Sequence, residues 1–596
     1  MKKMLLCLVI LLTGCLGSGP TPSITISGAV YQQDTAVPVV NAKITIETGS
    51  RSYHSESGLD GSFAITLRSS HSLLRITVEH PGYKPLTDKI HVNPSELEFL
   101  VLELTPKTPG QTLVAGRIDY ALPKLSSTAG VYAASAFPAE TNIKAASADL
   151  TEIIVEPYIF SEATAAAIAS ALQAKSYRLY HNAELLVLEK PWDTAIEIFV
   201  EAARNHPLVR QADINFPIVA SAKAALAPMS STFDNYSQWN FQAIYMNYAW
   251  QQIHNRNSDR RIRIAVLDTL IDIEHPDLNQ ILNLDDAYNV VKQNQHVGDN
   301  RSRAFSHGTH VAGIIAAAVD FHHSIEIIPI VVFDENDRGK ISDLIAGIEK
   351  ALELDVDIIN ISLGIDSLTN PYSHSLYKTI QKAADRGILM TASAGNYGNL
   401  IFPAKYSEVM AVGASTIHYQ IADYSAASGV EVFAPGGELY GHKIYSTNLR
   451  GGYAYAYGTS MAAPHAAGAA ALIKLGTPNI TNYEIEQLLW ETGTVLNFAD
   501  PDQRLINAYA AITRTPIANA VISFREKESL VEYKAYPEHN RYFYQFLPPG
   551  SYLVSAHIDT DRNQFVNSGD WYYQQEITVE ADQHINSLEI RLEVYP

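Results

Sequence analysis

The sequence predicts an α/β protein built on a parallel sheet with helices on both faces, flanked by two small β-sandwiches and a small α+β domain. Between residues 236 and 514, apolar strand-like runs alternate with amphipathic helical runs, which indicates a covered parallel sheet. In residues 22–106 and 516–596, short runs alternate apolar and polar residues, as antiparallel sandwiches do. The length of 596 residues exceeds what one hydrophobic core accommodates, so several domains are expected.

Composition and charge narrow the class of protein. Apolar residues make up 47% and charged residues 18%, a globular rather than a disordered composition. The formal net charge of -20, with no basic run, excludes a protein that binds phosphate backbones, so no nucleic acid partner is expected. Only Cys7 and Cys15 occur, so an exported fold that has lost Cys7 cannot use disulfide bonds.

Residues 1–15, MKKMLLCLVILLTGC, are predicted to be an export signal. Two lysines precede an apolar run shorter than the roughly 20 residues that cross a bilayer. The end, LTGC, resembles the lipobox of bacterial lipoproteins, which implies that Cys15 becomes the first mature residue and carries a membrane-anchoring lipid. Leu16 at the next position favours an outer-membrane address if the source is Gram-negative. An ordinary secretory signal, in which Cys15 is incidental, is the alternative.

Residues 22–106 are predicted to form the first β-sandwich, because runs such as ITISGAV, AKITIET and GSFAITL are separated by turn residues. The segments VPVVNAKITI, SGLDGSFAI and EHPGYKP resemble the carboxypeptidase-regulatory-like sandwich of many exported enzymes. No pattern of catalytic residues stands out here. A spacer between membrane and enzyme is therefore favoured over a ligand-binding module.

Residues 112–226 are predicted to form the α+β domain. EIIVEPYIF indicates a strand, SEATAAAIASALQAK a helix with a serine N-cap, and YRLYHNAELLVLEK a hairpin. DTAIEIFVEAARNH indicates a second helix and LVRQADINFPIV one last strand. The order β-α-β-β-α-β is ferredoxin-like, an arrangement that hosts many functions.

Three segments of region 236–514 each end a predicted strand or open a predicted helix. They are IAVLD with Asp268, SHGTHVAG with His307, and GTSMAAPHAAG with Ser460. Taken singly, an aspartate could cap a strand, His307 with His310 could be half of a metal site, and a serine could cap a helix. Together, Asp, His and Ser in this order match one of the chain orders in which a hydrolytic triad occurs.

The chemistry explains the unusual third segment. A serine hydroxyl is a poor nucleophile until an imidazole takes its proton, and a helix N-terminus directs N–H groups at the developing oxyanion. Ser460 is the expected nucleophile, His307 the general base and later the acid, and Asp268 the group that orients the imidazole. Gly458 permits a sharp turn, and Pro464 is expected in the first helical turn, where a missing N–H costs little.

HGTHVAG and GTSMAAPH resemble, without a gap, the active-site signatures of subtilisin-like serine proteases, and the likeness runs from SQWNFQAIYMNYAW to LINAYAAI. The resemblance implies a subtilisin-like fold and hydrolysis of extended protein or peptide substrates through an acyl-enzyme, with no cofactor for catalysis. It assigns Asn396 to the oxyanion hole and Ser362, Leu363 and Gly364 to a strand that pairs with substrate. The competing hypotheses are a surface adhesion or scaffold protein with a dormant protease domain, and an esterase.

One position departs from the family. Leu270 stands in DTLID where the family usually has glycine two residues after the aspartate. A side chain there is expected to crowd the turn beside the triad and to alter access of the substrate, but it removes no catalytic group.

Residues 149–219, which end in HPLVRQADINFPIV, resemble the inhibitor-like propeptides of the same family. The resemblance implies a domain that templates folding and blocks the cleft until it is cut, so its own propeptide becomes a partner of the enzyme. Self-cleavage is expected between Ala220 and Ser230, which would detach the catalytic domain from the anchored segment unless the propeptide stays bound. A permanent extra domain is the alternative.

Residues 516–596 are predicted to form the second sandwich, from runs such as NAVISF and QQEITVEA. Within it, DTDRNQFVNSGD spaces four oxygen-bearing side chains that could surround a structural Ca²⁺: Asp559, Asp561, Asn563 and Asp570. The central glycine and terminal glutamate of an EF-hand loop are missing. A solvated acidic turn is the alternative.

Overall fold

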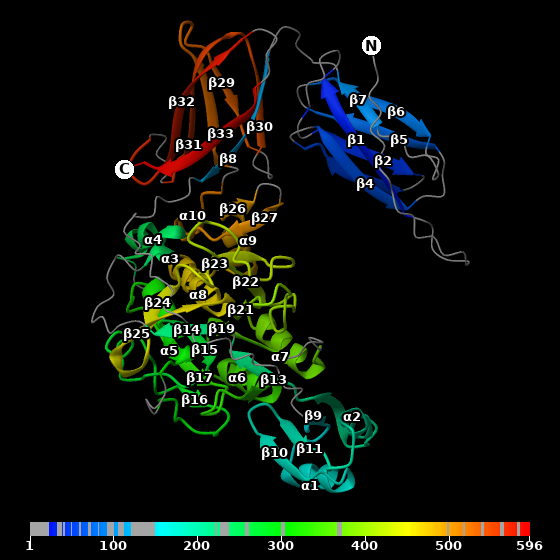
Figure 1. The fold of residues 1–596 in the computed structure, drawn as a ribbon, viewed down its shortest axis with the longest axis vertical. Coiled ribbons are helices and arrows are strands. Elements are labelled where there is room, and N and C mark those ends of the chain that lie inside the picture. The colour runs from blue at the N-terminus through cyan, green and yellow to red at the C-terminus, as the bar shows by residue number, and fades with distance from the viewer. Residues whose placement is uncertain are drawn as a thin grey trace. The chain divides into compact units, whose positions relative to one another are not determined.

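The computed structural model (Figure 1) divides the protein into two compact units, one made of 1–118, 520–557 and 572–590, the other of 119–519, 558–571 and 591–596. Within them the structure describes residues 23–32, 39, 42–48, 51–58, 61–68, 73–80, 83–91, 100–104, 112–120, 150–220, 223–226, 238–254, 256, 261–299, 304–365, 372–497, 500–516, 519–537, 542–560, 566–580 and 585–595. In this part of the chain no helix is both long enough and apolar enough to cross a membrane.

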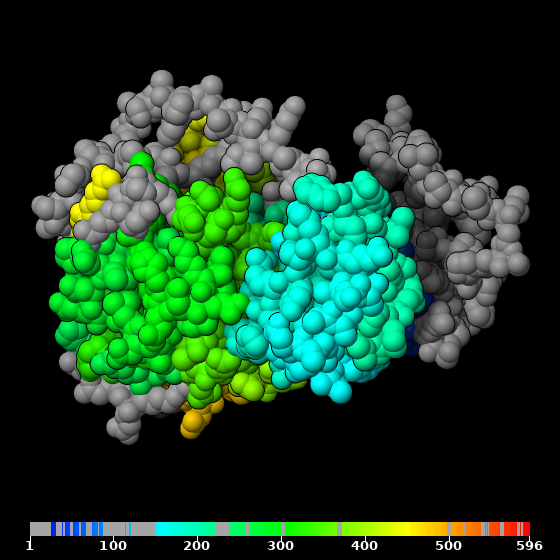
Figure 2. Space-filling model, turned by 90° about the horizontal axis from the view of Figure 1, so that it is seen from below, coloured from blue at the N-terminus to red at the C-terminus, as the bar shows by residue number. Residues whose placement is uncertain are grey.

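The second unit starts with the α+β domain, which has the strand order β10-β11-β9-β12. Its elements are β9 (Glu152–Pro157), α1 (Glu162–Ala171), β10 (Ser176–Tyr180), β11 (Leu185–Glu189), α2 (Ile196–Arg204) and β12 (Val209–Ile214). The side chain of Ser161 caps α1 by accepting a hydrogen bond from Thr164 N at 3.1 Å. In Figure 2 the cyan residues of this domain lie against the green residues of the parallel-sheet region.

The last predicted strand of the α+β domain is in fact two strands. The chain breaks after β12, and β13 (Pro217–Ala220) leaves the domain to pair with β18 (Gly339–Lys340) and β20 (Leu363–Ile365). A further short strand, β14 (Lys223–Leu226), pairs with β25 (Tyr453–Tyr457). One continuous strand was expected here from the sequence, and that expectation was wrong. Asn215 and Phe216 lie between β12 and β13, and the chain changes direction at these two residues.

The main sheet of this unit has nine strands in the order β16-β17-β15-β19-β21-β22-β23-β27-β26. Six central strands run parallel: β17 (Ile325–Val331), β15 (Ile262–Asp268), β19 (Ile358–Ile361), β21 (Leu389–Ser393), β22 (Met410–Ser415) and β23 (Val432–Pro435). The edge strands are β16 (Tyr288–Asn289), β27 (Asp500–Leu505) and β26 (Thr494–Asn497). The chain passes from β15 to β17 on one side and then to β19 on the other, so a crevice is expected at the carboxyl end of β15.

Helices cover both faces of this sheet. Ile264 and Val266 of β15 pack in one core with α5 (His307–Ala318) and α8 (Thr459–Gly476). Ala265 and Leu267 pack in the other core with α6 (Ile341–Glu353) and α7 (His374–Asp385). The smaller helices on the first side are α3 (Trp239–Ala243), α4 (Met246–Ile253), α9 (Asn482–Glu491) and α10 (Ala508–Thr513).

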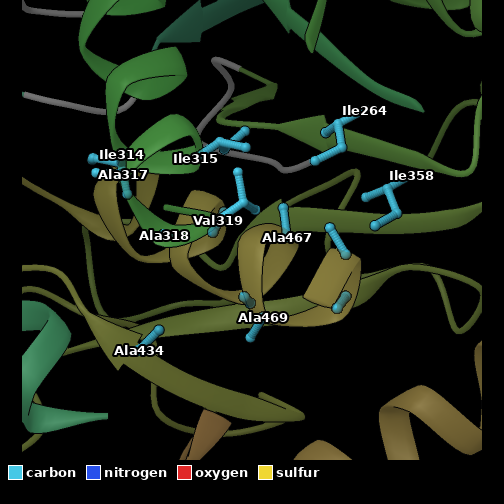
Figure 3. Packing of buried hydrophobic residues seen from close by; sticks show 14 of the residues in the cluster. Ile264, Ile314, Ile315, Ala317, Ala318, Val319, Ile358, Ala434, Ala467 and Ala469 are labelled. Atoms are coloured by element: carbon cyan, nitrogen blue, oxygen red, sulfur yellow. The ribbon is translucent and has the colours of Figure 1, made fainter. Parts of the chain in front are cut away.

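Small residues let α5 and α8 approach closely (Figure 3). A Cβ atom added at Gly468 of α8 would lie 2.5 Å from the Cβ of Ala318 on α5. In Figure 3, Ala467 of α8 lies near Val319, and Ala469 lies on the side of the helix toward Ala434; all four belong to one apolar core. The alanine-rich sequence of α8 is therefore that of a fully buried helix.

The first unit contains the sandwich strands. Its N-terminal part has the sheets β4-β1-β7 and β3-β2-β5-β6 around a core that includes Val30, Ile44 and Ile76. These strands are β1 (Ser23–Gln32), β2 (Lys43–Thr48), β3 (Arg51–Glu56), β4 (Ser62–Arg68), β5 (Leu73–Glu79), β6 (Leu86–His91) and β7 (Leu100–Leu104).

The C-terminal sheet has seven strands in the order β29-β28-β31-β32-β33-β8-β30. Six come from the end of the chain: β28 (Val521–Glu526), β29 (Glu532–Ala535), β30 (Tyr542–Leu547), β31 (Gly550–Ile558), β32 (Trp571–Val579) and β33 (Ile585–Val594). The seventh, β8 (Thr112–Tyr120), was expected to open the α+β domain at residue 112, and that boundary was wrong. Its partner strands lie more than 400 residues later in the sequence, a separation that no local pattern reveals.

Candidate active site

The structure brings Asp268 and His307 into direct contact. Asp268 is the last residue of β15 and His307 the first residue of α5. The ring Nδ1–H of His307 donates to Asp268 Oδ1 at 2.7 Å, and Thr269 N donates to the same oxygen at 2.7 Å. The two side chains are only 6% and 2% exposed, so their interaction is shielded from water.

The start of α5 is tied to the loop after β15. Ser306 caps the helix by accepting a hydrogen bond from Thr309 N at 3.2 Å, and its hydroxyl donates to Leu270 O at 2.7 Å. This connection sets the position of His307 relative to Asp268. The Leu270 side chain is 4% exposed and packs in the apolar core, so the expectation that it alters access of the substrate was wrong.

Ser460 is the second residue of α8, directly after the turn at Gly458. Gly458 has φ 139° and ψ 163°, a backbone conformation that favours glycine. The Ser460 hydroxyl donates to Ser362 O at 2.8 Å, and His307 Nε2 has no hydrogen-bond partner among the described residues. To transfer its proton, the Ser460 hydroxyl has to turn from Ser362 to His307.

Pro464 lies deeper in α8 than the sequence predicted. It is the sixth residue of the helix, so its missing N–H leaves the carbonyl of Ser460 without a helical donor. The Ser362 hydroxyl fills that position, donating to Ser460 O at 2.9 Å. The expected place in the first turn was wrong, and Pro464 instead makes room for a side chain that ties the nucleophile to the neighbouring strand.

Asn396 is held by the residue before the nucleophile. Thr459 donates to Asn396 Oδ1 from its backbone N and from its hydroxyl, both at 2.8 Å. The Thr459 hydroxyl in turn accepts a hydrogen bond from Gly395 N at 3.1 Å. These bonds make Nδ2 the donor end of the Asn396 amide, as an oxyanion hole requires. The role of Thr459 was missed, although its place between Gly458 and Ser460 could have indicated it.

If Asn396 is an oxyanion-hole donor, its replacement by alanine is expected to lower kcat by about 10²- to 10³-fold, the loss that removal of such a donor causes in a subtilisin. KM should change little, because the amide serves the oxyanion and not the ground state. Steady-state hydrolysis of a chromogenic peptide measures both constants. Thr459→Ser, which keeps both donors to Asn396 Oδ1, is the matched control, and an equal loss in this control would contradict the assignment.

The strand that was predicted to bind substrate is already paired. Leu363 and Gly364 of β20 lie opposite Ala220 and Val219 of β13 in antiparallel register. Ser362, directly before β20, is fully buried and contacts Ser460 through the two bonds described above. The chain's own segment therefore follows the edge along which an extended peptide would lie.

Two further histidines near the site are buried and neutral. His310 Nε2 donates to Ala454 O at 3.1 Å; His465 Nδ1 donates to Met461 O at 2.7 Å, and its Nε2 accepts from Asn240 at 2.7 Å. Burial lowers the pKa of His310 to about 3 and the pKa of His465 to about 4. The bond of His310 to a backbone carbonyl argues against a metal site shared with His307.

These pKa values predict acid sensitivity. The unfolded chain binds a proton at each histidine below pH 6.5, whereas the folded chain binds none until about pH 4, so stability falls as the pH falls through this window. His465→Gln should reduce the slope of unfolding free energy against pH by about 0.7 kcal/mol per pH unit near pH 6.5, rising to about 1.2 near pH 5. Urea unfolding of an inactive chain at pH 5 to 6.5 measures it, with the exposed His296→Gln as control; an unchanged slope in H465Q would be inconsistent with a buried neutral ring.

The predicted calcium ligands are only partly covered by the structure. Asp561 and Asn563, like Cys15 of the signal segment, lie outside the described residues. Asp570 is fully buried; its Oδ1 accepts from the backbone N and the hydroxyl of Thr560, both at 2.8 Å, and its Oδ2 accepts from Asn567 N at 3.0 Å. These bonds give Asp570 a role in fixing the turn, and a calcium site with Asp559 stays a prediction.

Residues 259–509 match the family described as "Subtilase family". The chain is 33% identical over 336 residues to the thermophilic serine proteinase of Bacillus sp. (strain AK1), covering 53% of this chain and 76% of the relative. It is 32% identical over 352 residues to the minor extracellular protease Epr of Bacillus subtilis (strain 168), covering 56% of this chain and about half, 51%, of the relative.

Among solved structures, the crystal structure of fervidolysin from Fervidobacterium pennivorans, described as a keratinolytic enzyme related to subtilisin, is similar with a TM-score of 0.50. The identity is 20%, and 80% of each chain is covered. At this identity the likeness concerns the fold alone.

Proposed function

Because the chain belongs to the subtilase family of serine endopeptidases, we propose that it is an exported protease that activates itself by cutting its own chain. The observation that carries the activity is the buried 2.7 Å hydrogen bond between His307 and Asp268, at the same sheet edge as Ser460. Protein or peptide chains are the substrates.

The reaction follows from the geometry. Ser460 Oγ attacks the carbonyl carbon while His307 Nε2 takes its proton, and Asp268 supports the imidazolium through Nδ1. The oxyanion is stabilised by Asn396 Nδ2 and the N–H of Ser460. His307 then protonates the leaving amine, the C–N bond breaks, and an acyl-enzyme remains on Ser460. Water attacks that ester with His307 again as the base, which restores the serine.

The α+β domain is proposed to be the inhibitory propeptide. It caps two helices of the catalytic region: Asp213 Oδ2 accepts from Ser375 N at 2.8 Å at the start of α7, and Asn215 Oδ1 accepts from Ser342 N at 3.0 Å at the start of α6. A negative or polar acceptor at a helix N-terminus is stabilising. The Tyr180 hydroxyl adds a bond to Asp343 at 2.6 Å.

The pairing registers support one bond as the site of self-cleavage. Ala220 pairs with Leu363, and Lys223 pairs with Tyr457 on the strand that leads into Ser460. Along the chain, only residues 221 and 222 separate these two paired positions. We therefore propose that the chain is cut between Ser221 and Ala222, inside the range that the sequence suggested.

A fluorophosphonate probe tests the activity and the processing together. Labelling is expected on Ser460, on a fragment whose N-terminal sequence begins Ala222-Lys-Ala-Ala-Leu, and casein should be hydrolysed. Failure to label would contradict the protease and favour a dormant domain, and labelling without cleavage of casein would favour an esterase. A fragment that starts elsewhere would contradict the proposed bond only.

Export with a lipid anchor at Cys15 is the remaining part of the proposal. It is supported by the LTGC segment and by the similarity to a protease described as extracellular. Incorporation of radioactive palmitate into the wild type but not into Cys15→Ser tests it. Palmitate in neither chain would leave an ordinary secretory signal as the explanation of the first residues.

A further inference from the structure

The strand β8 lies near the N-terminus in the sequence, but in the structure it pairs with strands from the C-terminal end of the chain. Thr112 to Arg117 pair antiparallel with Leu547 to Tyr542 of β30, and the other neighbour of β8 in the sheet is β33. β8 is thus an interior strand with a partner on each side. Its side chains Val114 and Ile118 are fully buried.

The end of β8 is fixed just as firmly in the second unit. The Tyr120 hydroxyl donates to Thr515 O, and the Tyr120 ring lies 4.4 Å from the ring of Trp571. Asp119 Oδ2 accepts a hydrogen bond from Val495 N at 3.1 Å and lies 3.6 Å from Arg591. Asp119 and Tyr120 are 1% and 0% exposed. Every one of these partners comes from the last hundred or so residues of the chain.

Self-cleavage would therefore cut between β8 and all of its partners. With the proposed cut after Ser221, β8 stays on the N-terminal fragment, whereas β30, β33, Trp571 and Arg591 are on the catalytic fragment. Withdrawal of β8 would expose the hydrogen-bonding edges of two strands and remove Asp119 from the buried N–H of Val495 and from the half-buried Arg591. Strand addition of this kind holds separate chains together in other proteins.

On the basis of the proposed self-cleavage, we propose that the N-terminal fragment is a permanent partner and that the mature enzyme is a two-chain protein held by β8. The consequence differs from the release expected from the sequence. Whatever anchors the N-terminal fragment, including a lipid on Cys15, also anchors the protease. Loss of inhibition then requires the α+β domain to move off the cleft, or to be cut again after Tyr120, while β8 remains in its sheet.

A chain that is cut by an added protease tests whether β8 keeps the N-terminal fragment bound, and this test does not require self-cleavage. A recognition site for a site-specific protease is inserted between residues 130 and 131 of the full chain carrying Ser460→Ala, which is purified in mild detergent and then cut. The fragment 1–130 contains β8 but none of the α+β domain, so only β8 and the first sandwich can retain it. Size-exclusion chromatography followed by denaturing gels shows whether it elutes with 131–596.

Co-elution of the two fragments, and their separation in guanidinium chloride, is the expected result. Elution of 1–130 as a separate species would overturn the proposal, whether or not the active chain processes itself. Ile118→Asp, which places a charge on a fully buried position of β8, should cause loss of co-elution after the nick. The exposed Lys43→Asp in β2 is the matched control and should leave co-elution intact.

A second and independent cluster points to a metal site. In the described part of the chain, one group of three histidine, cysteine or acidic side chains could hold a metal ion. It consists of His418, Glu438 and His442, whose potential ligand atoms all lie within 4.8 Å of one another. His418 Nε2 lies 3.8 Å and His442 Nδ1 3.9 Å from the Glu438 carboxylate, distances too long for hydrogen bonds. Glu438 is positioned by His442 N, which donates to Oε2 at 2.9 Å.

We infer that these three side chains bind a divalent transition metal such as Zn²⁺, for which two imidazoles and a carboxylate are suitable ligands. The metal would join two loops, because His418 follows β22 and the other two ligands lie between β23 and β24 (Ile444–Thr447). The second loop leads to the nucleophile: Gly458 N donates to Gly436 O at 3.0 Å. Binding is therefore expected to stiffen the turn before Ser460.

Calorimetric titration of the Ser460→Ala chain with Zn²⁺ tests this site. One equivalent should bind, and the unfolding temperature should rise. His418→Ala and Glu438→Gln should each weaken binding at least about tenfold, whereas the exposed His296→Ala should bind as before. If Zn²⁺ does not bind, or if neither His418→Ala nor Glu438→Gln weakens its binding, the proposed metal site is wrong.

Discussion

Replacing Ser460 by alanine is expected to lower kcat by about six orders of magnitude, as loss of the nucleophile does in a subtilisin, and to leave the chain in one piece. The effect is expected to be this large because the proposed mechanism places the acyl group on this hydroxyl. Hydrolysis of a peptide substrate measures turnover, and intact mass measures processing. The fold should be nearly unaffected, since the hydroxyl makes one hydrogen bond, to Ser362 O, worth about 1 kcal/mol.

The exposed Ser428→Ala serves as the control for that experiment and should keep the activity and the processing of the wild type. If the Ser460→Ala chain were still cut between Ser221 and Ala222 at the normal rate, another protease would have to be responsible. That result would contradict self-activation, but it would not contradict the proposal that Asp268, His307 and Ser460 form a hydrolytic triad.

Exchanging Asp268 for asparagine should lower kcat by about 10⁴-fold, the size this exchange has in another serine protease. Asp268 Oδ1 accepts hydrogen bonds from both His307 Nδ1 and Thr269 N. The amide of asparagine fits the same space but lacks the negative charge that supports the imidazolium, and it can orient the ring wrongly. KM should stay close to that of the wild type, because the carboxylate acts in the transition state.

Asp277→Asn is the matched control, because its carboxylate accepts a hydrogen bond from Tyr453 at 2.6 Å and does not contact the triad. It should keep a kcat close to that of the wild type. A small loss in Asp268→Asn, similar to that of the control, would mean that His307 is oriented by other groups.

The candidate active-site residues could be located in the sequence because each lies in a short contiguous segment with its own local signal. Asp268 ends an apolar strand, His307 and Ser460 open helices, and the parallel sheet then places these three ends at one edge. The order of helices and strands in the α+β domain could also be predicted, because it too depends on local sequence patterns. Periodicity and capping are properties of neighbouring residues.

What could not be predicted depends on contacts between distant residues. The pairing of β8 with β30 and the capping of α6 and α7 by Asn215 and Asp213 leave no trace in local patterns. The side-chain direction of Leu270 was also open, since a strand end can place it toward the cleft or the core. Its burial is decided by the helices that pack against it.

The contact between Gly468 and Ala318 has a bearing on catalysis that neither residue suggests by itself. α5 begins with the proposed base, and α8 carries the proposed nucleophile as its second residue; where the two helices touch there is no room for even one more methyl group. The spacing of the reacting atoms is thus set by apolar contact in the interior, at a depth substrate never reaches. The close packing of these two helices therefore fixes the positions of the side chains at their N-terminal ends.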